Sequence, residues 1–484
     1  MAKTRKKHKF LRFISTIIWL AAMVALGFLT YELYKANIMP TKYYAIIGGL
    51  ALFLLIVFFA FINHSRTRVW LFLFNDLIFI AVIIACYFGY TKLNDVMDFL
   101  KENLGAKYET DVYYFVVNKN SNYKKIKDIE GKTIKLVDDV DNKEELERNI
   151  NKKVSVTFEY LDTIVDALYD VQEKTDLIIF VNSGNYDAMV ENYEDFSDKV
   201  SILDELEMKY RVENDTTGVD VTEDPFVVYL SGIDTRSGKL PKKSLSDVNI
   251  LLVVNPTDRK ILMVHTPRDY YVQVAGTTGL KDKLTHAGLV GGIKTSKATI
   301  ENLYDIKVPY HVRVNFKAVT KLVDAVGGIT IYSDKKTSFT CWTDRSCRIK
   351  PGNNKVNGKC ALAFARERHA YKEGDRHRGE NQEQVISKLI EKVTSSKTLL
   401  TKSSDILKSL EGTFETNITP EEITSLVKMQ LEDMRGWTFE TYNVSGTDSM
   451  EYTRSYTSTQ LYVMKPDMKT VETAKTKIKE ALGK

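Results

Sequence analysis

Three long apolar runs open the chain, and shorter apolar stretches alternate with polar ones in the rest. The runs cover residues 11–34, 43–62 and 69–90. Each is close to the roughly 20 residues that an α-helix needs to cross a bilayer. Asn75 and Asp76 interrupt the third run, but the apolar residues around them can offset the cost of one buried carboxyl group. The pattern predicts three transmembrane helices within residues 11–92. A cleaved signal peptide, the alternative, would leave two further runs unexplained.

Basic residues predict how these helices cross the membrane. Lysines and arginines cluster in the tail of residues 1–10, and Arg66 and Arg68 lie between the second and third runs. Because basic loops stay on the cytoplasmic side, we expect a multi-pass protein of the cell membrane with a cytoplasmic N-terminus. Everything after residue 92 is then extracellular. Chemistry there has no cytosolic ATP or sugar nucleotide to draw on, so a transferase needs a donor that was energised inside and carried across.

Apolar segments of strand and helix length alternate over residues 93–210, which predicts a small accessory α/β domain. Strands are expected at 112–117, 134–137, 154–159 and 177–181, and helices at 144–149 and 163–169. The segment 123–134 resembles half a lobe of a solute-binding protein. No group of residues with catalytic character stands out, so a spacer or interaction module is the simplest expectation. An acidic linker poor in apolar residues follows at 211–225.

Residues 226–484 have the pattern of a second, mixed and layered α/β domain. Its strands are expected at 226–233, 249–254, 260–266 and 329–332, and its helices at 316–326 and 381–393. Composition mainly excludes functions. The net charge of +5 is small for 484 residues, so no basic field indicates a nucleic-acid partner. The sequence also lacks a zinc-ligand spacing, a Walker-type phosphate loop and the motif around a catalytic serine.

Three cysteines lie close together in this second domain. If the domain is extracellular, two of them can pair, and we expect Cys341 to pair with Cys347. Three unpaired thiols, with Cys360 among them, are the alternative, because a sequence does not fix a pairing. Cys86 lies inside an apolar run and is expected to be an inert buried thiol.

Acidic residues, arginines and one amide at the ends of predicted elements are the candidates for chemistry. They are Asp234, Asp247, Arg268, Arg366, Arg368, Asp375, Arg378 and Gln382. If the chain is extended after Ala365, Arg366 and Arg368 point the same way. Arg378 and Gln382 lie four residues apart on a predicted helix, on the face that continues into Leu389. The arginine and the amide are therefore expected to face the interior near the start of that helix.

Several arginines beside apolar helices predict an anion-binding site, since an interior arginine needs an anion or a carboxylate partner. Any one of them is explained by an internal salt bridge to Glu367, Glu373 or Asp375. Several that converge fit a pyrophosphate, which arginine binds bidentately and a helix N-terminus supports with backbone donors. Asp234 and Asp247 would hold Mg²⁺ on that pyrophosphate, although each alone is more commonly a cap or turn residue.

Seven motifs, in this order, resemble those of the LytR–CpsA–Psr (LCP) family. They are Gly232–Arg236, Ser246-Asp247, Pro267–Asp269, Lys283–Ala287, Val323–Ile329, Phe364–Arg368 and Gly374–Arg378. The resemblance covers residues 226 to 484. The three apolar runs and the intervening domain are similar to the capsule-associated CpsA branch of the family. Because seven ordered matches rarely occur by chance, the resemblance is specific.

The resemblance implies a function and a site. Family members bind polyprenyl pyrophosphate with the lipid tail in an apolar pocket, and they transfer the attached polymer as a glycosyl phosphate to peptidoglycan. By motif position, the implied pyrophosphate ligands are Arg268, Arg366, Arg368, Arg378 and Gln382. The implied Mg²⁺ ligands are Asp234 and Asp247, and the implied catalytic residues are Asp247, Arg268, Arg366 and Asp375. The family's late Arg-Gln-Gln is replaced here by Glu380-Asn381-Gln382, which leaves open which amide contacts phosphate.

Other functions are compatible with these residues. The same residues would serve a hydrolase that uses water as acceptor, or a non-catalytic lipid-binding protein that regulates capsule synthesis. A DNA-binding regulator would need a basic cytoplasmic domain, and only a short tail and one loop are expected there. Capsular polysaccharide is favoured as the polymer by the branch resemblance alone, and a teichoic acid remains open.

Overall fold

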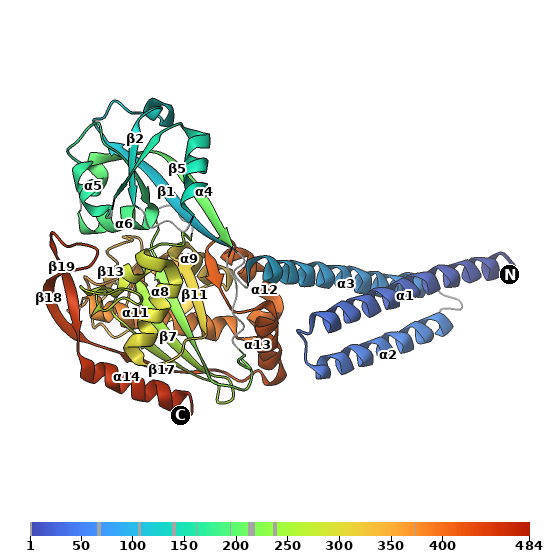
Figure 1. Cartoon of the computed structure of the whole chain (residues 1–484). Coiled ribbons are helices and arrows are strands. Elements are labelled where there is room, and N and C mark those ends of the chain that lie inside the picture. The colour runs from blue at the N-terminus through green and yellow to red at the C-terminus, as the bar shows by residue number, and fades with distance from the viewer. Residues whose placement is uncertain are drawn as a thin grey trace.

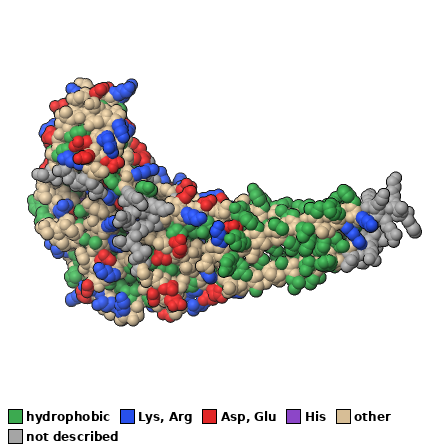
Figure 2. Space-filling model, turned by 45° about the vertical axis from the view of Figure 1, so that its right-hand side comes forward, with side chains coloured by type: hydrophobic (Ala, Val, Ile, Leu, Met, Phe, Trp, Pro, Cys, Tyr) green, Lys and Arg blue, Asp and Glu red, His purple; other side chains and the backbone are tan. Residues whose placement is uncertain are grey.

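Three long helices project from two globular α/β domains (Figure 1). The structure, a computed structural model, describes residues 2–64, 69–104, 108–137, 142–161, 163–193, 195–211, 218–235, 240–372 and 374–484. The long helices are α1 (Ala2–Ala36), α2 (Thr41–His64) and α3 (Val69–Asn103). All three are long and apolar enough to cross a membrane, and apolar side chains cover their outer surface in Figure 2. Arg66 and Arg68 lie outside the described residues, and the orientation of the helices stays a prediction.

Helix α3 does not end near residue 90, where its apolar run ends. It continues to Asn103 because Val96, Phe99 and Leu100 extend the helical apolar spacing. These side chains pack against α12 (Ser396–Leu410) and its neighbours in the C-terminal domain. The Asp95 carboxylate also accepts a hydrogen bond of 2.8 Å from Lys408 Nζ. The third apolar helix is therefore a continuous connection between the bundle of apolar helices α1–α3, called the membrane segment below because of its length and composition, and the C-terminal domain.

The first globular domain, residues 108–211, is called the accessory domain below. Its sheet has the order β3-β2-β4-β1-β5 and is mixed, because β1 is antiparallel to both neighbours while β2 is parallel to β3 and β4. The strands are β1 (Tyr108–Asn118), β2 (Thr133–Val137), β3 (Thr157–Leu161), β4 (Ile178–Asn182) and β5 (Val200–Arg211). The 3-10 helix η1 (Ile126–Ile129) and α4 (Lys143–Lys153) pack on one face. The opposite face carries α5 (Val165–Asp170), α6 (Ser183–Asn192) and α7 (Phe196–Lys199).

The C-terminal domain, residues 218–484, is built on a six-stranded sheet of order β16-β11-β6-β7-β8-β17. The strands are β6 (Phe226–Ile233), β7 (Val248–Asn255), β8 (Lys260–His265), β11 (Tyr310–Asn315), β16 (Phe414–Thr416) and β17 (Thr438–Asn443). Pairs β6–β11 and β8–β17 are parallel, and the other neighbours are antiparallel. Four short pairs complete the strands: β9 (Tyr271–Val272) with β10 (Asp282–Lys283), β12 (Ile329–Ser333) with β15 (Gly352–Val356), β13 (Phe339–Thr340) with β14 (Arg348–Ile349), and β18 (Gly446–Tyr452) with β19 (Gln460–Pro466).

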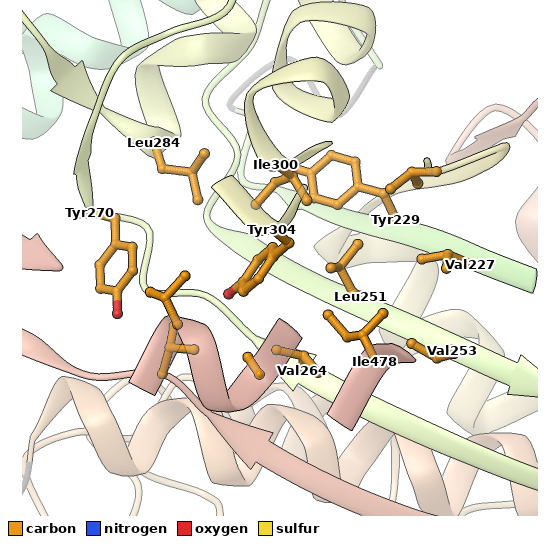
Figure 3. Close-up of a cluster of buried hydrophobic side chains, with 14 of the residues drawn as sticks. Val227, Tyr229, Leu251, Val253, Val264, Tyr270, Leu284, Ile300, Tyr304 and Ile478 are labelled. Carbon is orange, nitrogen blue, oxygen red and sulfur yellow. The ribbon is translucent and has the colours of Figure 1, made fainter. Parts of the chain in front are cut away.

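Helices cover both faces of the six-stranded sheet, so the predicted mixed, layered α/β class is confirmed. One face packs on α8 (Ala287–Tyr304), which follows the short η2 (Leu284–His286), and on α14 (Met468–Ala481). Figure 3 shows this layer, in which Ile300 and Ile478 belong to one buried cluster with the strand residues Leu251 and Val264. The other face packs on α11 (Asp375–Val393) and α13 (Pro420–Asp433). Helices α9 (Phe316–Ala325) and α10 (Gly358–Ala365) contact each other beside that layer.

The chain after Ala365 is not extended, so the condition under which Arg366 and Arg368 would point the same way along a strand is not met. Arg366 is the C-cap of α10 and has helical backbone angles, φ −99° and ψ −3°. The buried Glu367 carboxylate then accepts hydrogen bonds from the backbone N–H groups of His369 and Ala370 and, across the domain, of Trp342. A carboxylate that satisfies several backbone donors stabilises a turn here rather than a strand.

The expected disulfide is also wrong. The structure joins Cys347 to Cys360, with Cα atoms 5.2 Å apart, which lies within the usual span of a disulfide. Cys341 is a free, buried thiol whose Sγ lies 3.4 Å from that of Cys347. Spacing along the chain favours the nearer pair, but the first turn of α10 folds against the β13–β14 hairpin and brings Cys360 to it.

Peptide mapping under non-reducing conditions should therefore find a Cys347–Cys360 crosslink in protein purified from its membrane. Cys360→Ala should remove the crosslink and lower the unfolding temperature, because opening a loop of this size costs about 2–4 kcal/mol. Cys341→Ala is the control and should keep the crosslink. Recovery of a Cys341–Cys347 peptide would contradict the assignment.

Candidate functional site

A cavity of about 580 Å³ opens at the ends of the central strands of the six-stranded sheet, where β6 and β8 finish and β7 begins. Seven of the eight candidate residues line it: Asp234, Asp247, Arg268, Arg366, Arg368, Arg378 and Gln382. The other lining residues are Asp187, Val190, Glu191, Leu245, Asp269, Phe316, Trp342, Thr343 and His369. This space is called the arginine cavity below. The eighth candidate, Asp375, begins α11, but its side chain lies outside what the structure describes, as does all of Arg236 in the first motif.

Three neighbouring strands bring the first group of residues together. Asp234 follows β6, Asp247 precedes β7 and Arg268 follows β8. Because β6, β7 and β8 are successive antiparallel neighbours, the end of one strand lies beside the start of the next. The Asp247 backbone N–H donates to the Gly232 carbonyl at 2.8 Å, and a Cβ at Gly232 would lie 2.8 Å from the Val248 side chain. Gly232 therefore allows the close strand pairing that sets Asp247 beside Asp234.

The second group comes from α10 and α11. Arg366 ends α10, and Arg378 and Gln382 lie in the first turns of α11. A Cβ at Gly379 would lie 2.8 Å from the His265 ring, so a glycine is needed where α11 crosses the end of β8. Burial and the nearby Arg378 lower the pKa of His265 to about 3, and the Gln382 side chain acts in the opposite direction. Its imidazole is therefore neutral at physiological pH.

Of the two amides that the sequence left open, Gln382 is the one that lines the cavity. Asn381 is buried and is not part of the lining. The helical spacing of Arg378 and Gln382 correctly predicted their shared direction, since both face the cavity.

Two of the cavity arginines, Arg268 and Arg366, are paired with carboxylates. Arg268 forms ion pairs with Asp247 and Glu191 and lies 3.7 Å from Asp269. Arg366 binds Asp234 at 3.0 Å, with both side chains partly exposed, and its guanidinium carbon lies 4.9 Å from the Phe316 ring centroid. Internal salt bridges, the simpler explanation of single arginines, are thus present with other partners. Glu367 binds backbone donors instead, and Glu373 and the Asp375 side chain lie outside the described residues.

The lining carries five acidic side chains and four arginines. Its arginines are Arg268, Arg366, Arg368 and Arg378, and its carboxylates are Asp187, Glu191, Asp234, Asp247 and Asp269. Burial raises the pKa of Asp247 to about 7, and the charges of Asp234 and Asp269 act in the same direction, whereas Arg378 and Arg366 oppose it. The described lining therefore holds four cationic groups against five acidic ones.

Apolar side chains lead from this cavity toward α3. Phe316 lines the cavity and also packs into the layer between the sheet and α11 and α13. Within that layer Ile386 and Ile390 of α11 are only partly buried. Ile423 of α13 belongs both to this layer and to the cluster around Phe99 in α3. The charged cavity is thus joined by contacting apolar residues to the helix that continues into the membrane segment.

Comparison with known proteins identifies relatives of the C-terminal domain. Residues 189–479 match the LytR_cpsA_psr family. The chain is 32% identical over 234 residues to biofilm regulatory protein A of Streptococcus mutans serotype c, which covers 45% of this chain and 56% of that protein. It is 34% identical over 208 residues to the polyisoprenyl-teichoic acid–peptidoglycan teichoic acid transferase TagU of Bacillus licheniformis, which covers 43% and 65%. These matches span less than two thirds of either relative. The crystal structure of Bacillus subtilis TagV aligns with a TM-score of 0.45 and 27% identity, over 54% of this chain and 98% of that one.

Glu383, next to Gln382, gives the site region a testable pH dependence. Its side chain is buried, accepts a hydrogen bond from Asn443 Nδ2 at 3.3 Å, and has a pKa raised to about 8, chiefly by burial. The pKa of Glu383 is higher in the folded protein than in the unfolded chain. Its favourable contribution to the free energy of unfolding is therefore complete below the ordinary pKa of glutamate and is lost as pH rises toward 8. Glu383→Gln should unfold near the wild-type temperature at pH 5 and above it at pH 8.

Thermal unfolding of the detergent-purified full chain at several pH values measures this. Glu391→Gln is the matched control, since Glu391 lies on the same helix and is exposed. Parallel pH profiles for wild type and Glu383→Gln would contradict a protonated, buried Glu383.

Proposed function

The chain belongs to the LytR_cpsA_psr family, and from this premise we propose that it transfers a glycopolymer, as a glycosyl phosphate, from a polyprenyl-pyrophosphate carrier to peptidoglycan. The observation that carries the proposal is one cavity with four arginines, joined by apolar residues to a helix of the membrane segment. Such a cavity suits a ligand with an anionic headgroup and a hydrocarbon tail. The TagU relative is a polyisoprenyl-teichoic acid–peptidoglycan teichoic acid transferase by name, which supports a transfer from a polyisoprenyl carrier to peptidoglycan.

The arginines would exchange carboxylate partners for phosphate oxygens. The Arg366–Asp234 pair is partly exposed, with side-chain exposures of 39% and 45%, and such pairs contribute little stability. Phosphate offers a guanidinium several charged acceptors in a bidentate geometry. We assign Arg268, Arg366, Arg368 and Arg378 to the pyrophosphate, and the Gln382 amide to one of its oxygens. The lipid tail would follow Phe316 toward Ile386 and Ile390.

The charge balance of the lining favours a divalent cation. Five carboxylates already face four arginines, so a pyrophosphate would add negative charge to a cavity with no cationic excess. Mg²⁺ usually binds through one or two carboxylates together with substrate phosphates. Among the described residues, no group of three or more His, Cys, Asp or Glu is placed to hold a metal ion by itself. Asp234 and Asp247 would hold the ion, which would neutralise charge on the diphosphate.

The reaction needs no covalent enzyme intermediate. A hydroxyl of peptidoglycan attacks the sugar-proximal phosphorus, a new P–O bond forms, and the bond from that phosphorus to the bridging oxygen breaks. Polyprenyl phosphate leaves with the bonding electron pair, and the arginines stabilise its developing charge. The hydroxyl proton passes to a carboxylate, for which we propose Asp247. Asp375 keeps the role that its motif implies, as an alternative acceptor or as a partner that orients an arginine.

The proposed reaction fixes the side of the membrane on which the globular domains lie, but it does not fix which polymer is transferred. Because peptidoglycan lies outside the cell membrane, both globular domains would be extracellular and the N-terminal tail cytoplasmic. The TagU names favour a teichoic acid, whereas capsular polysaccharide rests on the resemblance to the CpsA branch. The proposal is therefore made for a glycopolymer, with these two as candidates.

The test is an assay of the full chain in lipid nanodiscs with a lipid-linked glycan, peptidoglycan oligomers and Mg²⁺. Arg268→Ala and Arg378→Ala should each reduce transfer about 10²- to 10³-fold, the usual loss when a donor to developing charge is removed. Chelation of Mg²⁺ should stop transfer. Arg435→Ala is the control, because this exposed arginine pairs with Asp433 away from the cavity.

The products separate the alternatives. Labelled polymer on peptidoglycan supports the transferase. Polymer released into solution would replace it with a hydrolase. An unchanged donor that still binds would indicate a non-catalytic lipid-binding protein.

A further inference from the structure

One wall of the arginine cavity belongs to the accessory domain. Asp187, Val190 and Glu191 lie three and four residues apart on α6, so they share one helix face. All three line the cavity. The domain that the sequence indicated as a spacer or interaction module therefore contributes two carboxyl groups to the site.

Helix α6 is fixed against the C-terminal domain by a buried polar contact at its start. Asp111 Oδ1 accepts hydrogen bonds from Asn182 Nδ2 at 2.5 Å and from the Lys243 backbone N–H at 3.4 Å. The Asn182 side chain also caps the helix by accepting from the Gly184 N–H. A Cβ at Gly184 would lie 2.7 Å from the Lys243 carbonyl oxygen. The N-terminal end of α6 is thus in direct backbone contact with the other domain.

Apolar contacts hold the remainder of the helix. Ala188 of α6 forms a buried cluster with Leu245 and Leu289 of the C-terminal domain. Tyr456 and Leu461, from the β18–β19 hairpin, pack into the core of the accessory domain. Because both ends of this interface are buried, the position of the α6 backbone is set by packing. The Glu191 side chain is still 35% exposed, so it can turn away while the helix stays in place.

Glu191 forms an ion pair with Arg268, whose guanidinium also contacts Asp247. A phosphate at Arg268 needs the same N–H donors that Glu191 now uses. We propose that Glu191 is a specificity-determining residue of the site: its carboxylate holds the anion position at Arg268, and a phosphate-bearing ligand binds there by displacing it.

This inference rests on the proposed function and adds a role for the accessory domain. The donor must offer Arg268 stronger contacts than a carboxylate does, and the carboxylate is available to return when the phosphate product leaves. Glu191 therefore weakens the binding of the donor and, separately, the binding of the phosphate product. An anion that cannot outcompete a carboxylate is kept off the arginine.

Binding of inorganic pyrophosphate to the full chain, measured by calorimetry at constant Mg²⁺ and salt, tests the inference. Glu191→Gln should lower the dissociation constant about fivefold, which corresponds to the loss of one partly exposed ion pair. Glu144→Gln is the matched control. It makes the same charge change in the accessory domain, on α4 at the opposite face of the sheet, and should leave binding unchanged.

A double-mutant cycle separates competition at Arg268 from a general effect of charge. In an Arg268→Ala background, binding should be weaker overall, and adding Glu191→Gln should change it less than twofold. A fivefold gain that persists without Arg268 would overturn the inference, as would unchanged or weaker binding in Glu191→Gln. Unfolding temperatures of all variants verify that each one folds.

The binding data also distinguish an error in the proposed function from an error in the role of Glu191. If wild type does not bind pyrophosphate, or binds it equally well after Arg268→Ala and Arg378→Ala, the phosphate site itself is contradicted, and the inference falls with it. If binding depends on Arg268 but not on Glu191, only the inference is overturned.

Discussion

Guanidinium groups that are partly withdrawn from water need negative partners, and the arginine cavity is organised around that need. In the structure Arg268 is held by Asp247 and Glu191, and Arg366 by Asp234. These carboxylates keep the arginines in place without a ligand, but they also compete with any phosphate that approaches. The site is therefore a set of ion pairs in which phosphate can replace carboxylate. Its affinity for a phosphate ligand depends on how much more strongly the arginines bind phosphate than carboxylate.

The fold supplies the positions at which this exchange can occur. The end of β6, the start of β7 and the end of β8 lie next to one another and set Asp234, Asp247 and Arg268 side by side. Helices α10 and α11 bring further arginines over these strand ends, and Gly379 allows α11 to cross close to His265. On the far side, the apolar layer under α11 and α13 reaches the cluster around Phe99 of α3. A charged headgroup and an apolar tail would thus be accommodated by adjoining parts of one domain.

Much of this arrangement could be predicted from the sequence. Apolar periodicity located the three long helices, strand β6 to the residue, and the shared direction of Arg378 and Gln382. Ordered motifs identified seven of the sixteen residues that line the cavity. The errors have a common cause, since each depends on contacts between segments far apart in the chain. The turn at Glu367 needs the backbone of Trp342, the disulfide needs α10 against the β13–β14 hairpin, and the extension of α3 needs α12. The place of Glu191 in the cavity is invisible to local patterns, because two domains must dock before it faces Arg268.

The most direct measurement is an experimental structure of the full chain in a lipid nanodisc, with a polyprenyl diphosphate and Mg²⁺. We expect both phosphate groups among Arg268, Arg366 and Arg378, an ion beside Asp234 and Asp247, and the first isoprene units along Phe316 and Ile386. We also expect the Glu191 side chain to be turned away from Arg268. A headgroup bound elsewhere, with Arg268 and Arg366 still held by their carboxylates, would contradict the proposed site.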